Sequence, residues 1–366
     1  MRFILFFVVF LCTYITGRAQ QPVFNLYDAI DAYLTERFPA DQPGVAVFVG
    51  RDTNKIFFQW GYGLADLKTK KPIDTKTVFN LGSVSKTFVA FGILKLQEEG
   101  KLSIEDPILK YFPQFKNKQL IKDIRIKHLL SHTSGLPDNR PVETDSVFYL
   151  TAKDAENWAP IMQTDQLNFQ PGEKFEYSNP AFNGLALIIE KVSGMKWQEY
   201  LQKKIIQPSG MKHTVITDGA FPDKGVSHAY QQINGKWSEY DFGEYPTFCA
   251  SGNGGVWSNV EDLFKYEIAI QKHVFLSKES IALSRTIFNP PNWKSEQAPF
   301  IGYSWFLTTA VGYKMQGHSG DQGGFRAEYV YLPDSKFFIA ILSNGSHDLL
   351  PIRDQIIKYL KLATLL

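Results

Sequence analysis

The sequence of 366 residues predicts an α/β (α+β) fold: one antiparallel sheet built from both chain ends, flanked by terminal helices, with an inserted and mostly helical lobe. Three observations support this prediction. Strand patterns cluster near the two ends of the chain, an amphipathic helix accompanies each cluster, and helical patterns and loops dominate between them. We therefore expect a sheet lobe from about residues 20–76 and 300–366, and a helical lobe from about 77–299.

The first nineteen residues have the features of a cleaved secretory signal peptide. Arg2 precedes the apolar run Ile4–Leu11, and small residues follow at Gly17 and Ala19. The run is too short to cross a bilayer as a stable helix. Cys12 follows a leucine rather than a small residue, which disfavours a lipid anchor. We therefore expect export across a bacterial inner membrane, a periplasmic mature chain, and no stable membrane insertion after signal removal.

The rest of the chain, residues 20–366, is expected to form a single domain. Removing Arg2 and Arg18 brings the 39 basic residues level with the 37 acidic ones, so the mature protein has no excess charge to attract nucleic acid or an anionic membrane. Cys249 is then the only cysteine, which excludes an internal disulfide. No Pro/Ser-rich linker, charge run or repeat marks a boundary between domains.

The first elements are predicted by periodicity. Apolar residues at helical spacing predict a helix over 25–38, which Pro39 ends. Two β-rich runs, 44–50 and 55–62, predict strands joined by a polar turn.

The middle of the chain is mostly helical in pattern. We expect helices over 124–131, 180–192 and 197–206. One two-residue hairpin turn, Asn234-Gly235, is expected within 230–240.

Strand patterns return near the C-terminus. Their ranges are 302–308, 313–318, 326–332 and 336–343, and an amphipathic helix over 349–362 follows them. Both chain ends therefore contribute strands, and a pocket is expected at the seam between the two lobes.

Ser83 and Lys86 are the first candidate catalytic pair. If Ser83 opens the apolar helix over 87–96, Lys86 lies one turn further on the same face. A helix N-terminus offers free N–H groups to developing negative charge. This arrangement suits a serine nucleophile with a lysine base. The alternative is that Ser83 merely caps the helix and Lys86 is a solvated charge.

The Ser-x-x-Lys spacing occurs twice more, at Ser193/Lys196 and Ser209/Lys212. Ser193 precedes a glycine at the end of a helical pattern, and Ser209 lies between Pro208 and Gly210. Only Ser83 begins an apolar helix, which favours it among the three.

Tyr177 and Asn179 form a second constellation, in a polar loop that leads into a helix. A phenol whose pKa is lowered by a nearby ammonium can relay a proton to a leaving group. An amide side chain can both donate to and accept from a substrate amide. The alternative is a buried tyrosine followed by a helix-capping asparagine.

A third constellation, His318-Ser319-Gly320, follows a strand. Its glycine permits close backbone approach, and a strand edge beside the nucleophile can offer one oxyanion donor while the Ser83 N–H offers the other. No Gly-Lys-Ser/Thr follows, which disfavours a phosphate cradle. The seven histidines show no metal-ligand spacing, so we expect neither metal nor cofactor.

Together, these motifs resemble the penicillin-recognising serine hydrolases, and most closely the branch with class C β-lactamases, D-aminopeptidases, D-alanyl-D-alanine carboxypeptidases and related esterases. Further matching stretches are Phe79–Phe88, Leu129–Leu136, Gly254–Ser258 and Asp262-Leu263. The resemblance covers about residues 25–362 and implies the β-lactamase/transpeptidase-like fold.

The resemblance also implies roles for the candidate residues. Ser83 would be the acylated nucleophile and Lys86 part of its base. Tyr177 would assist proton transfer, and Asn179 would hold a substrate amide. The N–H groups of Ser83 and Asp321 would form the oxyanion hole.

The third motif departs from one pattern in this family. Class C β-lactamases and many transpeptidases have Lys-Thr-Gly where this chain has His318-Ser319-Gly320. A lysine there pairs with the substrate carboxylate, whereas a neutral histidine gives only a hydrogen bond. The exchange is common among esterase-like and aminopeptidase-like relatives, and it disfavours strong β-lactamase activity.

We therefore expect a serine hydrolase that acts through an acyl-enzyme on a small ester, a D-amino-acid-containing peptide or a related amide. One alternative is a true β-lactamase or a peptidoglycan carboxypeptidase. Another is a binding module that keeps the fold without the chemistry. The expected partner is a small-molecule or peptide substrate, and the sequence does not predict the oligomeric state.

Overall fold

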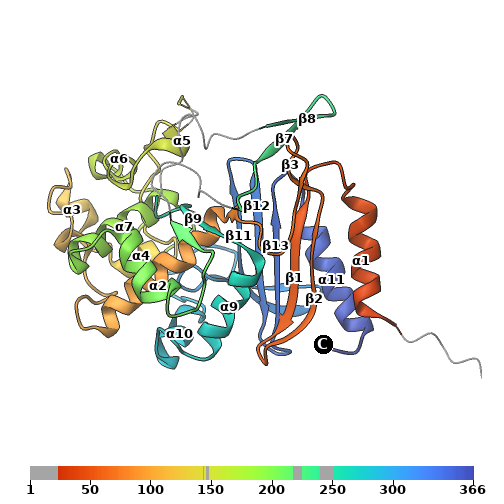
Figure 1. The fold of residues 1–366 in the computed structure, drawn as a ribbon. Coiled ribbons are helices and arrows are strands. Elements are labelled where there is room, and N and C mark those ends of the chain that lie inside the picture. The colour runs from red at the N-terminus through yellow and green to blue at the C-terminus, as the bar shows by residue number, and fades with distance from the viewer. Residues whose placement is uncertain (1–23, 143, 146–147, 217–224, 240–250) are drawn as a thin grey trace, which may run out of the picture.

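The computed structural model describes residues 24–142, 144–145, 148–216, 225–239 and 251–366. The predicted signal peptide and Cys249 lie outside these residues. The described chain has a sheet covered on one face by two helices and on the other by a mostly helical lobe (Figure 1).

The main sheet has six antiparallel strands in the order β10-β11-β12-β13-β1-β2. It joins the two ends of the chain, because β1 pairs with β13 in the register Val45↔Ser343 to Arg51↔Phe337. The predicted antiparallel sheet built from both chain ends is therefore confirmed. The strands are β1 (Val45–Arg51), β2 (Lys55–Tyr62), β10 (Phe306–Ala310), β11 (Tyr313–Gln322), β12 (Phe325–Leu332) and β13 (Phe337–Ser343).

The terminal helices α1 (Leu26–Arg37) and α11 (Leu350–Leu362) cover the outer face of this sheet (Figure 1). Asn25 caps α1 by accepting the N–H groups of Tyr27 and Asp28. Both helices bury apolar side chains, such as Ile30 and Ile356, against strand residues in one core cluster. These contacts hold the two ends of the chain together.

The opposite face of the sheet packs on the helical lobe in a second, larger core cluster. The longer helices of this lobe are α2 (Ser85–Glu98), α7 (Asn179–Ser193), α9 (Val260–Gln271) and α10 (Lys278–Ser284). Short helices and turns are α3 (Lys118–Ile121), α4 (Ile126–Leu130), α5 (Phe148–Thr151), α6 (Asp154–Trp158), α8 (Trp197–Leu201), η1 (Gly82–Val84), η2 (Ile108–Lys110), η3 (Ile161–Gln163) and η4 (Gln202–Ile206).

Short strands complete the chain. β5 (Phe79–Asn80), β9 (Val256–Ser258) and β6 (Val215–Ile216) form a small sheet, and β3 (Leu64–Asp66) pairs with β4 (Lys71–Pro72). The predicted Asn234-Gly235 hairpin is present as β7 (Tyr230–Ile233) and β8 (Lys236–Glu239).

A buried ion pair ties the helical lobe to the sheet. Arg285 donates two hydrogen bonds of 2.8 Å to the carboxylate of Glu267 on α9. The Tyr329 hydroxyl on β12 donates to the same carboxylate, and the Arg285 guanidinium lies 4.1 Å from the centre of the Trp305 ring. All four side chains are buried, so this pair is anchored from both lobes.

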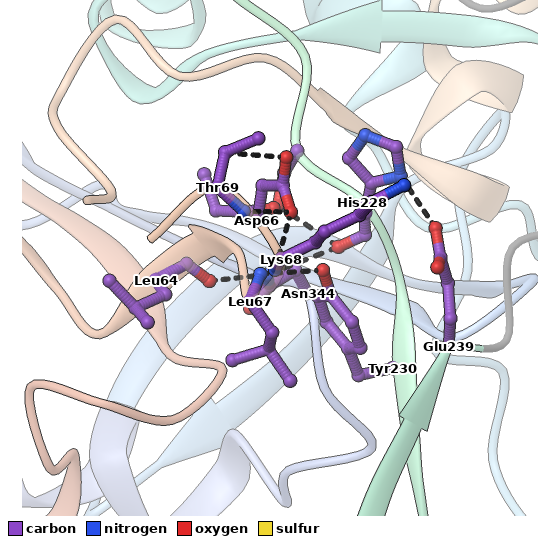
Figure 2. A network of polar contacts seen from close by, with 11 residues as sticks. Leu64, Asp66, Leu67, Lys68, Thr69, His228, Tyr230, Glu239 and Asn344 are labelled. Carbon is purple, nitrogen blue, oxygen red and sulfur yellow. Dashed lines mark hydrogen bonds and ion pairs between the residues drawn. The ribbon is translucent and has the colours of Figure 1, made fainter. Parts of the chain in front are cut away.

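A second polar network links the hairpin region to the strand ends (Figure 2). The Asn344 side chain, just after β13, donates to the carbonyl groups of Leu64 and His228 at 2.9 and 3.1 Å. The hydroxyl of Tyr230 accepts the Leu67 N–H at 2.9 Å. These bonds fix the segment that begins β7 against the end of the main sheet.

Candidate functional site

The turn that carries Ser83 connects β5 to α2. Asn80 at the end of β5 accepts the Gly82 N–H at 2.7 Å through its side-chain oxygen. Gly82 has a φ angle of +49°, a conformation that favours glycine. Ser83 follows within the 3₁₀ turn η1, and α2 begins at Ser85. The nucleophile candidate therefore lies in a tight turn just before the helix rather than in its first turn.

Lys86 lies directly beside Ser83. Its Nζ donates hydrogen bonds to the Ser83 hydroxyl oxygen at 2.9 Å and to the Asn253 carbonyl oxygen at 2.6 Å. The Lys86 side chain is fully buried, whereas Ser83 is partly exposed. The lysine amine is thus held behind the serine and away from solvent.

The surroundings of Lys86 favour a neutral amine. Burial holds the pKa of Lys86 well below its ordinary value, and the positive charge of Arg140 lowers it further. Arg140 is itself fixed by hydrogen bonds to Asp138 and Asn157. A neutral amine has the lone pair that a base needs to accept the Ser83 proton.

Tyr177 faces the same amine. The Lys86 Nζ lies 5.1 Å from the centre of its ring. The ring stacks on His132, with a centroid distance of 4.4 Å and an angle of 21° between the planes. His132 is fully buried, and its Nδ1 accepts the Ser178 N–H at 2.9 Å. His132 therefore supports both the Tyr177 ring and the chain that follows it.

Asn179 is the first residue of α7, and Ser178 provides the helix cap by accepting the Ala181 N–H. The asparagine side chain is thus not used as the cap. Its Oδ1 is buried and has no hydrogen-bond partner among the described residues. Asn179 itself lines the cavity beside Ser83.

Strand β11 passes very close to the Ser83 turn. A Cβ atom built on Gly320 would lie 2.0 Å from the Leu81 carbonyl oxygen and 3.1 Å from the Ser83 nitrogen. A Cβ atom on Gly82 would lie 2.7 Å from the Asp321 nitrogen. Glycine at both positions allows the backbone of β11 to lie directly against the Ser83 turn.

His318 on β11 is buried, with 4% of its surface exposed. Its Nδ1 contacts the Ser319 carbonyl oxygen at 2.6 Å, and its Nε2 has no partner among the described residues. Burial lowers the pKa of His318 to about 3. The imidazole is therefore uncharged near neutral pH.

These groups meet in one cavity of about 520 Å³. Its lining includes every predicted site residue except the fully buried Lys86: Ser83, Tyr177, Asn179, His318, Ser319, Gly320 and Asp321. Phe306 adds an apolar wall, and Glu328 and Leu350 line it on the side of α11. A substrate carbonyl in this cavity would have access to the Ser83 hydroxyl.

The two other Ser-x-x-Lys matches have structural roles. Ser193 is the last residue of α7, and Lys196 is 71% exposed beside Glu190. The Ser209 hydroxyl donates to the Ile205 carbonyl at 2.7 Å. Neither serine contacts a buried lysine in the described part of the chain.

Sequence reasoning did not select His132 or Asn253. His132 lies within the family-like stretch Leu129–Leu136, where no motif gives it a role of its own. Asn253 acts through its backbone carbonyl, which carries no side-chain signal. Within the described ranges, no group of three or more His, Cys, Asp or Glu side chains could hold a metal ion. Nor does any described helix have the length and apolar character needed to cross a bilayer.

A serine hydroxyl beside a buried lysine amine, at the seam between a sheet and a helical lobe, defines a site suited to nucleophilic catalysis. The sequence model of the Beta-lactamase family matches residues 30–360. The chain therefore belongs to the Beta-lactamase family.

Two curated relatives are similar to most of this chain. Penicillin-binding protein 4* of Bacillus subtilis (strain 168) is 29% identical over 309 residues, which cover 80% of this chain and 66% of that protein. Protein flp of Staphylococcus aureus (strain MW2) is 29% identical over 319 residues, 84% of this chain and 61% of that protein. The chain thus spans about two thirds of the length of these relatives.

Solved structures share the fold. The octameric penicillin-binding protein homologue from Pyrococcus abyssi has a TM-score of 0.78 at 27% identity, covering 92% of this chain and 77% of that one. The D-amino acid amidase from Ochrobactrum anthropi SV3 has a TM-score of 0.76 at 21% identity, covering 92% and 99%. The expected β-lactamase/transpeptidase-like fold is confirmed.

Proposed function

We propose that this protein is a serine hydrolase that cleaves an ester or amide through an acyl-enzyme on Ser83. The observation that carries the proposal is the 2.9 Å contact between Ser83 Oγ and the buried Nζ of Lys86, at the wall of the cavity. Membership of the Beta-lactamase family supports it. A module that only binds a ligand has no need of a buried amine beside its serine.

In the proposed first step, neutral Lys86 accepts the hydroxyl proton of Ser83 while Oγ attacks the substrate carbonyl carbon. Electrons move to the carbonyl oxygen, where the N–H groups of Ser83 and Asp321 stabilise the charge. The close approach of Gly320 to the Ser83 turn supports this pairing of donors.

The leaving group then needs a proton. In the proposal Tyr177 relays one, and its position in the cavity wall, with its ring beside the Lys86 amine, supports this role. Asn179, which lines the cavity, would hold a substrate amide through its side-chain amide. Water finally attacks the Ser83 ester, releases the acid and restores the hydroxyl.

The neutral state of His318 favours a small ester or a D-amino-acid-containing peptide over a substrate that must present a carboxylate. The second candidate is a β-lactamase or peptidoglycan DD-carboxypeptidase, which the similarity to penicillin-binding protein 4* supports. The signal-like pattern of residues 1–19 supports export to the periplasm. Mass spectrometry of the N-terminus of protein from a periplasmic extract tests the export and the cleavage site.

The enzymatic test compares p-nitrophenyl butyrate, D-alanine p-nitroanilide, a D-Ala-D-Ala muropeptide and nitrocefin. We expect turnover of the ester or the D-alanine anilide, and Ser83→Ala should lower kcat by about 10⁶-fold if the residues act as one unit. Ser193→Ala and Ser209→Ala are matched controls and should keep wild-type turnover. A loss of less than about tenfold in Ser83→Ala would reject the assignment.

A further inference from the structure

The carbonyl that accepts the hydrogen bond from Lys86 belongs to a tight turn packed on α7. The N–H groups of Gly254 and Gly255 donate to the Ser251 carbonyl at 3.0 and 2.9 Å, which closes the turn. A Cβ atom on Gly252 would lie 2.6 Å from the Phe182 carbonyl oxygen of α7. The position of this turn on α7 therefore determines where the Asn253 carbonyl oxygen accepts the hydrogen bond from Lys86 Nζ.

A buried carboxylate fixes the turn from behind. Asp154, at the start of α6, accepts the Gly252 N–H at 2.8 Å and the Nδ2 of Asn183 at 2.7 Å through the same oxygen. The Asn183 Nδ2 also donates to the Ser251 hydroxyl at 2.9 Å. That hydroxyl in turn donates to the side-chain oxygen of Asn253.

The network is continuous and hidden from solvent. Asp154, Asn183, Ser251 and Asn253 are each at most 7% exposed. Buried hydrogen-bond networks of this kind hold their members in one arrangement, because an unmade bond costs the full desolvation of the group. None of the four side chains is among the residues that line the cavity at Ser83.

We propose that Asp154 is a positioning residue for Lys86: its carboxylate holds the 251–254 turn on α7, so that the Asn253 carbonyl orients the Lys86 amine toward Ser83. The inference rests on the proposed function, because it assigns Asp154 a part in the Ser83–Lys86 reaction. Asp154 acts through the turn and does not touch the reacting atoms.

The surroundings of Asp154 make its carboxyl group easier to protonate than an ordinary aspartate. Burial raises its pKa to about 7, against the hydrogen bonds from Asn183 and Gly252, and the charge of Glu190 on α7 raises it further. A small cavity of about 120 Å³ adjoins Asp154, and Lys153, Glu190 and Lys196 also line it. Glu190 is partly neutralised by Lys196, which lies 3.7 Å away. Protonation near neutral pH would weaken Asp154 as an acceptor.

The test measures the single-turnover rate constant for phosphonylation of Ser83 by a fluorophosphonate, in which fluoride leaves, between pH 5 and 9. The reactive fraction, measured as final adduct, reports how much protein is folded. Asp154→Ala should lower the rate constant by about 100-fold at full adduct yield. A small displacement of the Lys86 amine slows the reaction even though Ser83 and Lys86 are both still present. Asp154→Asn keeps one acceptor oxygen, so its rate constant should stay within about tenfold of wild type and lose the pH dependence near 7.

Two further variants separate positioning from general stability. Ser251→Ala breaks the link to Asn253 without touching Asp154, and should lower the rate constant by about tenfold. Asp262→Ala is the matched control: Asp262 is also buried and accepts a loop amide, the His213 N–H at 2.6 Å, but has no hydrogen bond to the 251–254 turn. It should lower the melting temperature and leave the rate constant for phosphonylation unchanged.

Wild-type rate constants and pH profiles in folded Asp154→Ala and Ser251→Ala would overturn the inference while leaving the proposed function intact. If Asp154→Ala does not fold, the rate constant of Ser251→Ala alone tests the inference, and a wild-type value would overturn it. A wild-type protein that forms no adduct with the fluorophosphonate would overturn both the proposed function and this inference.

Discussion

Lys86 Nζ lies 2.9 Å from Ser83 Oγ, and the amine is fully buried with no acidic partner among the described residues. A buried amine without a counter-charge releases its proton more readily than one in water. The burial that keeps the Lys86 amine neutral therefore also lowers the stability of the folded protein.

Lys86→Met should abolish acylation and yet raise the melting temperature at pH 6. The pKa of Lys86 is lowered in the folded protein, whereas the unfolded lysine titrates near its ordinary value of about 10.4. Between these two values the unfolded state binds the extra proton, so wild-type stability rises with pH. The difference in melting temperature between variant and wild type should shrink from pH 6 to pH 9.5. A difference in melting temperature that stays constant from pH 6 to pH 9.5 would contradict a neutral buried Lys86.

His318→Lys should speed acylation by benzylpenicillin by about tenfold or more, because a lysine ammonium adds charge–charge attraction to the hydrogen bond that a neutral imidazole offers the substrate carboxylate. His318 itself is uncharged, since burial lowers its pKa to about 3. Acylation by a neutral p-nitrophenyl ester is the control and should not increase. An equal change for both substrates would show that position 318 does not sense the substrate carboxylate.

Gly320→Ala should lower the acylation rate constant by about 100-fold, because the added methyl would force β11 away from the Ser83 turn. The new Cβ would lie 2.0 Å from the Leu81 carbonyl oxygen. Gly100→Ala is the control: apart from its two chain neighbours, no described residue has an atom within 4 Å of the added Cβ, and the φ angle of +68° costs only backbone strain. Single-turnover acylation of both variants checks this, and wild-type activity in Gly320→Ala would contradict the proposed oxyanion geometry.

Arg285→Met should lower the free energy of unfolding by about 3–5 kcal/mol, since it leaves Glu267 as an uncompensated buried carboxylate. The two side chains are 5% and 1% exposed. In the exposed pair Lys116–Asp165, with side chains 55% and 65% exposed, Lys116→Met should cost less than about 1 kcal/mol. Urea unfolding measures both, and equal losses would show that the Glu267–Arg285 pair does not anchor the lobes.

Much of the fold could be predicted from local sequence, because periodicity and caps act within a few residues. The helix expected over 25–38 is α1 (Leu26–Arg37), since Asn25 caps it and the buried Ile30 and Leu34 lie on one face. The hairpin turn at Asn234-Gly235 is present for the same reason: its positive φ angles suit these two residues.

Elements that depend on distant partners were predicted less well. The strand expected over 313–318 continues to Gln322, because β12 supplies hydrogen-bond partners as far as Phe325. The extension consists of Gly320 and three polar residues, which carry no strand signal of their own. The helix expected over 197–206 changes at Gln202 into the π-helical η4.

The same distinction holds for the candidate site. Side-chain motifs selected Ser83, Lys86 and Tyr177 because their chemistry is visible in the sequence. The Asn253 carbonyl, the Asp154 network and the support of Tyr177 by His132 were not found, because each depends on contacts between segments far apart in the chain.

The most direct test of the account is to locate the adduct formed when the purified protein reacts with a fluorophosphonate. Intact mass should show a single addition, and peptide mapping should place it on Ser83. Ser83→Ala should show none, while Ser193→Ala and Ser209→Ala should react like wild type. An adduct on another serine, or an unmodified wild-type protein, would contradict the assignment of Ser83 as the nucleophile.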